Sequence, residues 1–193
     1  MPRQVDLAER RRVIAEAVCR LADESGLEGV TLRDVAERAG LSMGAVQRCF
    51  RTKEEMLVHA LRHIGGRIER RVRERLGAGP AQSSASAVGY AAEELALLRA
   101  EHRSEARVWL AFLAQAAVSE ALAGPLRAGY AASEELFLGL LAEAGVAPEV
   151  REVEVRTLLA LVDGLTAHVL VGQLTESRAA EVLHAHLERL WRG

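Results

Sequence analysis

Five residues close together in the sequence could contact a nucleic acid: Met43, Gly44, Ala45, Gln47 and Arg48. They fall on the outward face of a short predicted helix, with the small residues in its first turn. Small residues let a helix N-terminus approach a phosphate, and glutamine and arginine can donate to phosphates or to base edges in the major groove. A face exposed only to solvent would more often carry glutamate and lysine. The pattern favours DNA contact, although an ordinary helical hairpin can have the same spacing.

Two short helices joined by a tight turn must position this face. The first begins at Thr31, whose hydroxyl can cap the free amides of the first turn, and Asp34 favours the positive end of the helix dipole. Gly40 ends this helix, because the turn needs a left-handed backbone that glycine adopts without steric cost. Ser42 can cap the second helix, which we expect from about residue 43 to residue 50. The arrangement is a helix-turn-helix.

A further helix begins directly after this pair. Val46 and Phe50 are spaced i, i+4 and should pack against the first helix, which turns the five residues above outward. Thr52 and Glu55 then have the spacing of a capping box, and Lys53 lies in the first turn of the helix that they open.

In order and spacing, the turn, Phe50 and the capping box resemble the DNA-binding domain of the TetR family of transcriptional regulators, over roughly residues 13–61. The family usually has a tyrosine where this chain has Gln47, and an aromatic residue or histidine where it has Cys49. A glutamine can still donate to phosphate or bind adenine, so the departures concern the operator sequence rather than DNA binding itself.

The resemblance implies a dimeric regulator, most often a repressor, that binds a palindromic double-stranded DNA operator and is released by a small-molecule effector. An effector-independent DNA-binding or architectural protein that acts through a protein partner is the alternative. The residues predicted to contact DNA are Thr31, Arg33, Ser42, Met43, Gly44, Ala45, Gln47, Arg48 and Lys53.

The composition favours an all-α protein. Half of the 193 residues are hydrophobic but only 4% are aromatic, and the long segments are rich in alanine, leucine, arginine and glutamate. Residues 1–7 are predicted to form a mobile arm. Helices are predicted at about residues 6–24, 31–40, 43–50, 53–76, 84–99, 104–122, 125–143, 148–171 and 177–191.

Three segments are expected along the chain: a three-helix DNA-binding domain at 1–52, a connecting helix at 53–76, and a helical bundle for ligand binding and dimerisation at 77–193. Residues 1–76 hold fifteen arginines and one lysine against twelve acidic residues, a balance of +4. Because the whole chain carries −2, the remainder carries −6. Positive charge beside the helix-turn-helix suits a domain that docks on phosphates.

Other classes of protein find little support. No Ser-His-Asp order, phosphate-binding glycine loop, HExxH motif or spaced Cys/His set is present, so we expect no enzyme, metal or cofactor. Apolar runs are too short to span a membrane and no signal peptide opens the chain, which favours a cytoplasmic protein. Cys19 and Cys49 should remain thiols there.

A pocket for the effector is expected in the C-terminal half. Aromatic residues could supply its bulk and a few polar groups its orientation, but each aromatic could equally be core. Asp163 interrupts an apolar run and should therefore have a buried partner or face a polar cavity. The candidate ligand-binding residues are His102, Trp109, Phe112, Gln115, Tyr130, Phe137, Asp163 and His168.

The last two long helices are the candidates for the dimer interface, because two amphipathic helices can form a four-helix bundle with their symmetry mates. A monomeric bundle that buries the same residues internally is the competing interpretation. The predicted contacts are Leu159, Val162, Thr166, Leu170, Leu183, Leu187 and Leu190.

Two features of the connecting helix each allow two interpretations. Gly65 and Gly66 lie inside it, and each costs roughly 1 kcal/mol relative to alanine, so the pair indicates a kink or the close approach of another backbone. The arginines at 67–75 alternate with Glu69 and Glu74, which favours a solvated face with i, i+4 ion pairs over a DNA-binding run.

Overall fold

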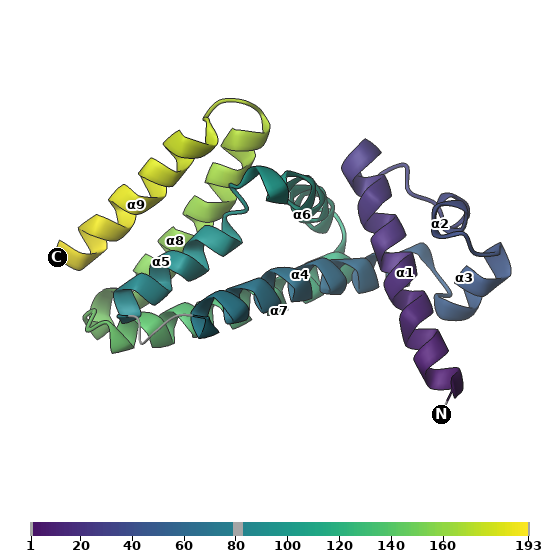
Figure 1. Ribbon diagram of the computed structural model, residues 1–193, viewed down its shortest axis with the longest axis horizontal. Helices are drawn as coiled ribbons and strands as arrows, with labels where there is room; N and C mark the ends of the chain where they lie inside the picture. Colours follow the sequence, from purple (N-terminus) through teal and green to yellow (C-terminus); the bar gives the residue numbers. More distant parts are fainter. Residues whose placement is uncertain (1, 79–82, 193) are drawn as a thin grey trace. The chain divides into compact units, whose positions relative to one another are not determined.

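The computed structural model describes residues 2–78 and 83–192, with side chains from Leu7 onward, and these residues form helices without any strand (Figure 1). The predicted all-α fold is confirmed. The helices are α1 (Pro2–Ser25), α2 (Leu32–Ala39), α3 (Met43–Cys49), α4 (Lys53–Gly77), α5 (Ser84–Leu95), the 3-10 helix η1 (Ala100–His102), α6 (Arg103–Ala116), α7 (Glu120–Glu143), α8 (Pro148–Leu170) and α9 (Glu176–Arg192). No helix in this described part is both long and apolar enough to cross a membrane.

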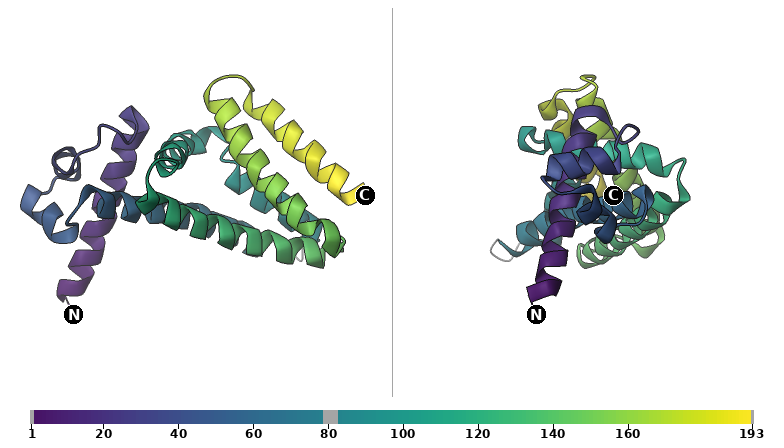
Figure 2. Two further views of the ribbon diagram at one scale, coloured as in Figure 1. Left: turned by 180° about the vertical axis from the view of Figure 1, so that it is seen from behind. Right: turned by 90° about the vertical axis from the view of Figure 1, so that its right-hand side faces the viewer.

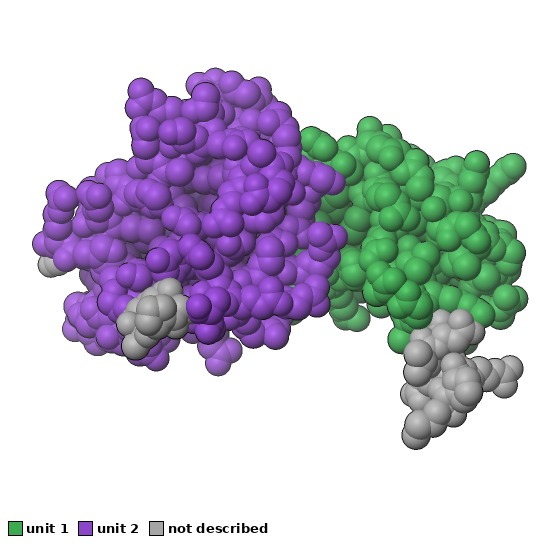
Figure 3. Space-filling model, in the orientation of Figure 1, with its two compact units in different colours: residues 1–66, 107–128 green, residues 67–106, 129–193 purple. Residues whose placement is uncertain are grey.

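The chain forms two compact units, each made of two separate segments (Figure 3). Unit 1 consists of Met1–Gly66 with Arg107–Ala128, and unit 2 consists of Arg67–Ala106 with Gly129–Gly193. The helices α4, α6 and α7 therefore contribute to both units. These two structural units differ from the predicted functional segments, whose boundaries lie at residues 52 and 76. The functional segments stay a prediction.

Unit 1 is organised around α1, which packs against both α2 and α3 (Figure 2). Ile14, Ala17 and Val18 are fully buried, as their helical spacing predicts, and they share a core with Val35 of α2 and Val46 of α3, which are also fully buried. α2 and α3 are short, so this shared apolar core, rather than helix propensity, holds α3 in place.

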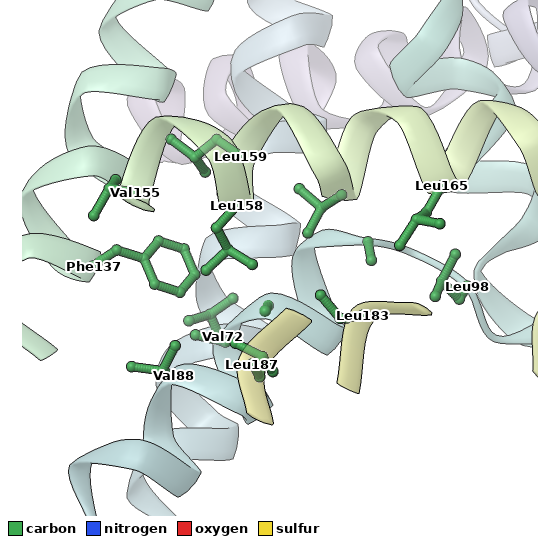
Figure 4. Packing of buried hydrophobic residues seen from close by; sticks show 14 of the residues in the cluster. Val72, Val88, Leu98, Phe137, Val155, Leu158, Leu159, Leu165, Leu183 and Leu187 are labelled. Carbon is green, nitrogen blue, oxygen red and sulfur yellow. The ribbon is translucent and has the colours of Figure 1, made fainter. Parts of the chain in front are cut away.

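Unit 2 is a helical bundle whose core is drawn from five helices (Figure 4). Val88 of α5, Phe137 of α7, Leu158 of α8 and Leu183 of α9 are almost completely buried, and Val72 of α4 packs with them. In Figure 4 the ring of Phe137 points toward Leu158. Replacing such a residue with alanine typically costs about 2–5 kcal/mol of the free energy of unfolding.

The structure corrects four predicted helix boundaries, one of which is the end of α6, at Ala116 rather than near residue 122. The segment expected to be a mobile arm is helical, because α1 begins at Pro2, and proline is well tolerated in a first helical turn. α7 begins at Glu120, so Pro125 lies inside it rather than at its start. α5 ends at Leu95, because Leu97 adopts a left-handed conformation with a φ of 49°.

At Gly65 and Gly66, α4 continues as a helix, and a Cβ added to either glycine would meet no atom within 4 Å. A close approach of another backbone is therefore not the reason for these glycines. The unit boundary follows Gly66 directly. The loop predicted after α4 lies partly outside the described residues.

Candidate nucleic-acid interface

The helix-turn-helix has caps at both of its helix starts. The Thr31 hydroxyl accepts from the Asp34 backbone N–H at 3.2 Å, and the Asp34 carboxylate accepts from the Thr31 N–H at 3.3 Å, which makes a full capping box. Between the helices, Gly40 has a left-handed φ of 65°. Ser42 Oγ then accepts from the Ala45 N–H at 3.2 Å and caps α3. These interactions confirm the predicted turn geometry and fix the direction in which α3 leaves it.

The exposed face of α3 consists of Met43, Gln47 and Arg48, together with the backbone around Gly44. A Cβ on Gly44 would lie 3.5 Å from a terminal nitrogen of Arg48, so the guanidinium folds back across that glycine. We define these four residues as the α3 face. It presents one guanidinium, one amide and one flexible apolar chain, a set that can contact both phosphates and base edges.

Ala45 does not belong to this face, and its predicted outward position is wrong. The side chain is buried beside Val46, Cys49 and Phe50. The buried side of α3 is two residues wide, because the pairs at i, i+4 starting from Ala45 and from Val46 both point inward. The prediction assumed one buried residue per helical turn, whereas α3 packs against both α1 and α2 and buries two.

The other residues predicted to contact DNA lie around α3 and differ in their exposure and hydrogen bonds. Arg33 and Ser42 are exposed. Thr31 is also exposed, but its hydroxyl donates to Asp34 at 2.6 Å. Lys53 Nζ donates to the backbone carbonyl of Glu28 at 3.1 Å, so its ammonium group ties the start of α4 to the loop before α2. An ammonium has three donors, which leaves capacity for a phosphate.

The back of α3 carries a contact that the sequence did not suggest. The last carbonyl of α3, from Cys49, accepts from the Arg11 guanidinium at 3.3 Å. The same guanidinium lies 5.5 Å from the centroid of the Phe50 ring, and the centroid of the His59 ring lies 5.2 Å from it. Burial lowers the pKa of His59, and the positive charges of Arg11 and His63 lower it further.

The predicted ligand-binding residues are divided between the two units. Trp109, Phe112 and Gln115 belong to unit 1, and the other five belong to unit 2. Phe112 and Phe137 are fully buried, which supports the competing interpretation of these rings as core, and His168 is exposed.

Asp163 has the partner that its position requires, since the Tyr130 hydroxyl donates a hydrogen bond to its carboxylate. Burial raises the pKa of Tyr130, and the bond to Asp163 raises it further.

A small pocket in unit 2 is lined by apolar residues of the α5–η1 loop, α6 and α8 and by three charged side chains. Its free volume of about 10 Å³ suits one water molecule rather than an effector. The lining residues are Leu97, Leu98, Arg99, Arg103, Ala106, Thr166, Val169, Leu170 and Glu176.

Part of the arginine run on α4 pairs with buried glutamates of other helices, which corrects the predicted solvated face. Arg71 lies 2.6 Å from Glu105 of α6 and 3.3 Å from Glu94 of α5, and both glutamates are less than 9% exposed. The i, i+4 pair of Arg73 with Glu69 is exposed, as predicted. Sequence spacing could not reveal Arg71, because its partners lie 23 and more residues away.

The residues predicted to form the dimer interface lie mostly inside the single chain. Leu159, Val162, Thr166, Leu183 and Leu187 are buried within unit 2. Leu170 and Leu190 are half-buried. An amphipathic stripe indicates that one face of a helix is buried, but not whether the same chain or a partner buries it. Here the same chain buries most of these residues.

Comparisons with known proteins agree with this architecture. Residues 14–60 match the family described as bacterial regulatory proteins, tetR family, and residues 87–192 match BetI-type transcriptional repressor, C-terminal. The regulator BetI of Burkholderia thailandensis is 31% identical over 89% of this chain and 87% of its own length. The regulator PksA of Bacillus subtilis is 29% identical over 98% of this chain and 94% of its own.

Solved structures show the same fold. A transcriptional regulator from Rhodococcus sp. Rha1 aligns with a TM-score of 0.86 at 31% identity, covering 95% of this chain and 96% of its own. A regulator from Saccharomonospora viridis in complex with choline aligns with a TM-score of 0.83 at 22% identity, covering 94% and 96%.

The family matches and the named relatives identify a transcriptional regulator with a helix-turn-helix rather than an enzyme. The chain belongs to the TetR family.

Proposed function

We propose that the protein is a ligand-responsive homodimer that represses transcription by occupying a palindromic operator through the α3 face, and that a small-molecule effector releases it. The observation that carries DNA contact is the α3 face itself, because Met43, Gln47 and Arg48 are exposed on a helix whose caps and core fix its orientation. A regulator that binds chromosomal DNA works in the cytoplasm. The match of residues 87–192 to BetI-type repressors supports repression.

An uncharged stripe on α8 supports dimerisation. From Val150 to Gly164 its exposed positions recur with alternating spacings of three and four residues, a pattern typical of helices that pack in parallel or antiparallel pairs. Val153 and Val171 are 63% and 78% exposed, and Ala160 and Gly164 are small enough to let a second helix approach closely. If a second copy of this chain packs on the stripe, the resulting dimer has two α3 faces that can contact one duplex. The α8 stripe consists of Val150, Val153, Thr157, Ala160 and Gly164, together with Val171, the C-cap residue directly after α8.

An effector remains part of the proposal because of polar groups buried in unit 2. His102 is 8% exposed and its Nδ1 has no hydrogen-bond partner within the described chain. Buried polar groups normally find partners, so a ligand or a water is expected to supply one. The choline complex of the Saccharomonospora viridis regulator shows that a protein of this fold can hold a small molecule.

The alternative is a DNA-binding protein that responds to no effector and acts through a protein partner. One observation favours it: the pocket described in unit 2 has a volume of only about 10 Å³. A ligand would require this region to open.

Selection of DNA tests the proposal. The purified protein is incubated with random duplexes, and the retained fragments are sequenced; inverted repeats spaced by about one helical turn or a multiple are expected. The enriched operator is then titrated with and without choline and other small metabolites. Loss of operator affinity with one of them supports the effector, whereas retention of unrelated sequences in equal measure contradicts operator binding.

A further inference from the structure

The contact behind α3 involves three helices of unit 1. Arg11 belongs to α1, Phe50 follows α3, and His59 belongs to α4. Phe50 is 5% exposed and lies against both of the other side chains. A cation over an aromatic face is attracted by the ring quadrupole, and an additional hydrogen bond orients the guanidinium. Arg11 has both, because it also donates to the Cys49 carbonyl.

The Cys49 carbonyl is the last of α3 and has no partner inside the helix. A positive charge at this end interacts favourably with the helix dipole. Arg11 therefore satisfies the carbonyl and the dipole together, and its guanidinium carbon lies 5.5 Å from the centroid of the Phe50 ring. Lysine offers the charge but not the planar group.

α3 has only seven residues, so contacts with its neighbours must set its orientation. Ser42 fixes its first turn and Val46, fully buried, fixes its middle. At its last turn, Phe50 and Arg11 provide the connection to α1. Without Arg11 this end keeps its apolar packing but loses its polar attachment.

We propose that Arg11 is a positioning residue for the α3 face: it acts on DNA recognition through Cys49 and Phe50 and sets the angle at which Gln47 and Arg48 meet the bases. The proposal rests on α3 being the helix that contacts DNA. Because Arg11 is itself an exposed cation that contacts the end of α3, a direct phosphate contact is the alternative role that an experiment must separate.

Two consequences distinguish the roles. A phosphate contact releases counterions, so its loss weakens binding to every sequence and reduces the salt dependence by about one charge. A positioning contact leaves the salt dependence unchanged and weakens the selected operator more than an unrelated duplex, because base contacts need the correct angle and backbone contacts tolerate error.

The experiment compares Arg11→Lys and Arg11→Gln with Arg12→Gln in the full-length protein. Arg12 is the matched control, since it is the neighbouring exposed arginine of α1 and pairs with Glu9 and Glu16 instead. Affinities for the selected operator and for an unrelated duplex are measured over a series of salt concentrations. Circular dichroism confirms the helical content of each variant.

Positioning predicts that both Arg11 variants lose roughly tenfold in operator affinity, lose much less on the unrelated duplex, and keep the wild-type salt slope. Arg12→Gln should keep the wild-type ratio of the two affinities. An equal loss on both duplexes with a shallower slope, a Lys variant that behaves like wild type, or no loss at all would overturn the proposal. If Arg11→Gln fails to fold, Arg11→Lys alone decides between these outcomes.

The assumption about α3 is tested separately. Arg48→Ala and Gln47→Ala should both alter DNA binding if α3 contacts the duplex. If neither does while the Arg11 variants still lose operator affinity, the α3 face is misassigned, and that result is distinct from an unchanged Arg11 variant.

Discussion

At the scale of single residues, Gln47 and Arg48 are adjacent and both exposed, yet their groups suit different parts of DNA. The guanidinium carries a full charge on a long chain and suits phosphate, whereas the shorter neutral amide suits base edges. The two side chains therefore divide affinity and sequence preference between them.

Arg48→Ala is expected to weaken binding to all duplexes and to lower the salt slope by about 1, whereas Gln47→Ala should change which sequences are preferred. Salt-dependent titrations and a repeated selection measure the two effects. Arg178→Ala, which removes an exposed arginine of α9, is the control. An unchanged slope for Arg48→Ala would contradict its phosphate contact.

Lys53→Ala is a related case in which the structure supplies a second cause. We expect weaker binding to all sequences and a slope lower by about 1. The bond from Lys53 to the Glu28 carbonyl means that stability should also fall. Thermal unfolding measured beside the titrations separates the two effects, since lost stability alone leaves the slope unchanged.

His59 gives unit 1 a pH-dependent stability. Its pKa in the folded chain is lowered by burial and by the charges of Arg11, His63 and Arg62, so the unfolded chain binds its proton more readily. The free energy of unfolding should therefore fall as the pH drops below about 6.5, the ordinary histidine value, and stay unaffected by this group above it.

Urea unfolding at about pH 7.5 and pH 5.5 measures this dependence. His59→Gln should reduce the loss of stability at the lower pH, and His184→Gln, an exposed histidine of α9 next to Glu93, should not reduce it in the same way. An equal pH dependence in wild type and His59→Gln would exclude His59 as the cause.

At the scale of elements, α4 is one of the helices that contribute to both units, and Gly65 and Gly66 lie at the unit boundary within it. Both positions have room for a methyl group, so Gly65→Ala with Gly66→Ala should stiffen the helix without a clash. If the pair is a hinge, the double variant changes the effector's influence on DNA affinity more than operator affinity without effector.

Operator titrations with and without an identified effector measure that change, on a scale of about 5- to 150-fold for typical coupling. Gly139→Ala on α7, at an exposed helical glycine that also has open space for a methyl group, is the control. An unchanged ratio of the two affinities in the double variant rules out the hinge.

Helix boundaries were predictable where a local signal sets them. Thr31, Gly40, Ser42 and Pro148 each act within a few residues, and the structure has helix ends at or beside all four. The ends of α5 and α6 lack such a signal. Leu97 adopts its left-handed backbone in a buried position, which is a tertiary effect that no nearby residue type indicates.

At the scale of the whole molecule, the α8 stripe should hold two copies together. Ala160→Arg places a charge at its centre, where a partner helix would leave it buried without a partner. The variant should sediment as a monomer at micromolar concentration and lose operator affinity. Ala131→Arg, at an exposed alanine of α7, should leave the wild-type state unchanged. A wild-type chain that is itself monomeric would contradict the dimer.

The two halves of the chain differ in how far the sequence determines their interpretation. The α3 face follows from short-range spacing, and only Ala45 was misplaced. In the C-terminal half, burial of Leu183 and Leu187 could come from this chain or from a partner, and the periodicity is the same in both cases. The buried ion pairs of Arg71 depend on contacts between helices, which spacing along one helix cannot supply.

Unit 1 is made of two separate segments of the chain, which limits how its DNA-binding part can be exchanged between this regulator and its relatives. Asp23 of α1 pairs at 2.5 Å with Arg107 of α6, which is encoded some eighty codons downstream. A chimaera that fuses residues 1–66 to the effector half of another protein would inherit a foreign surface opposite Asp23. Transplanting the DNA specificity of this chain should therefore succeed more often by grafting the α3 face alone, or by carrying residues 107–128 along with the N-terminal segment.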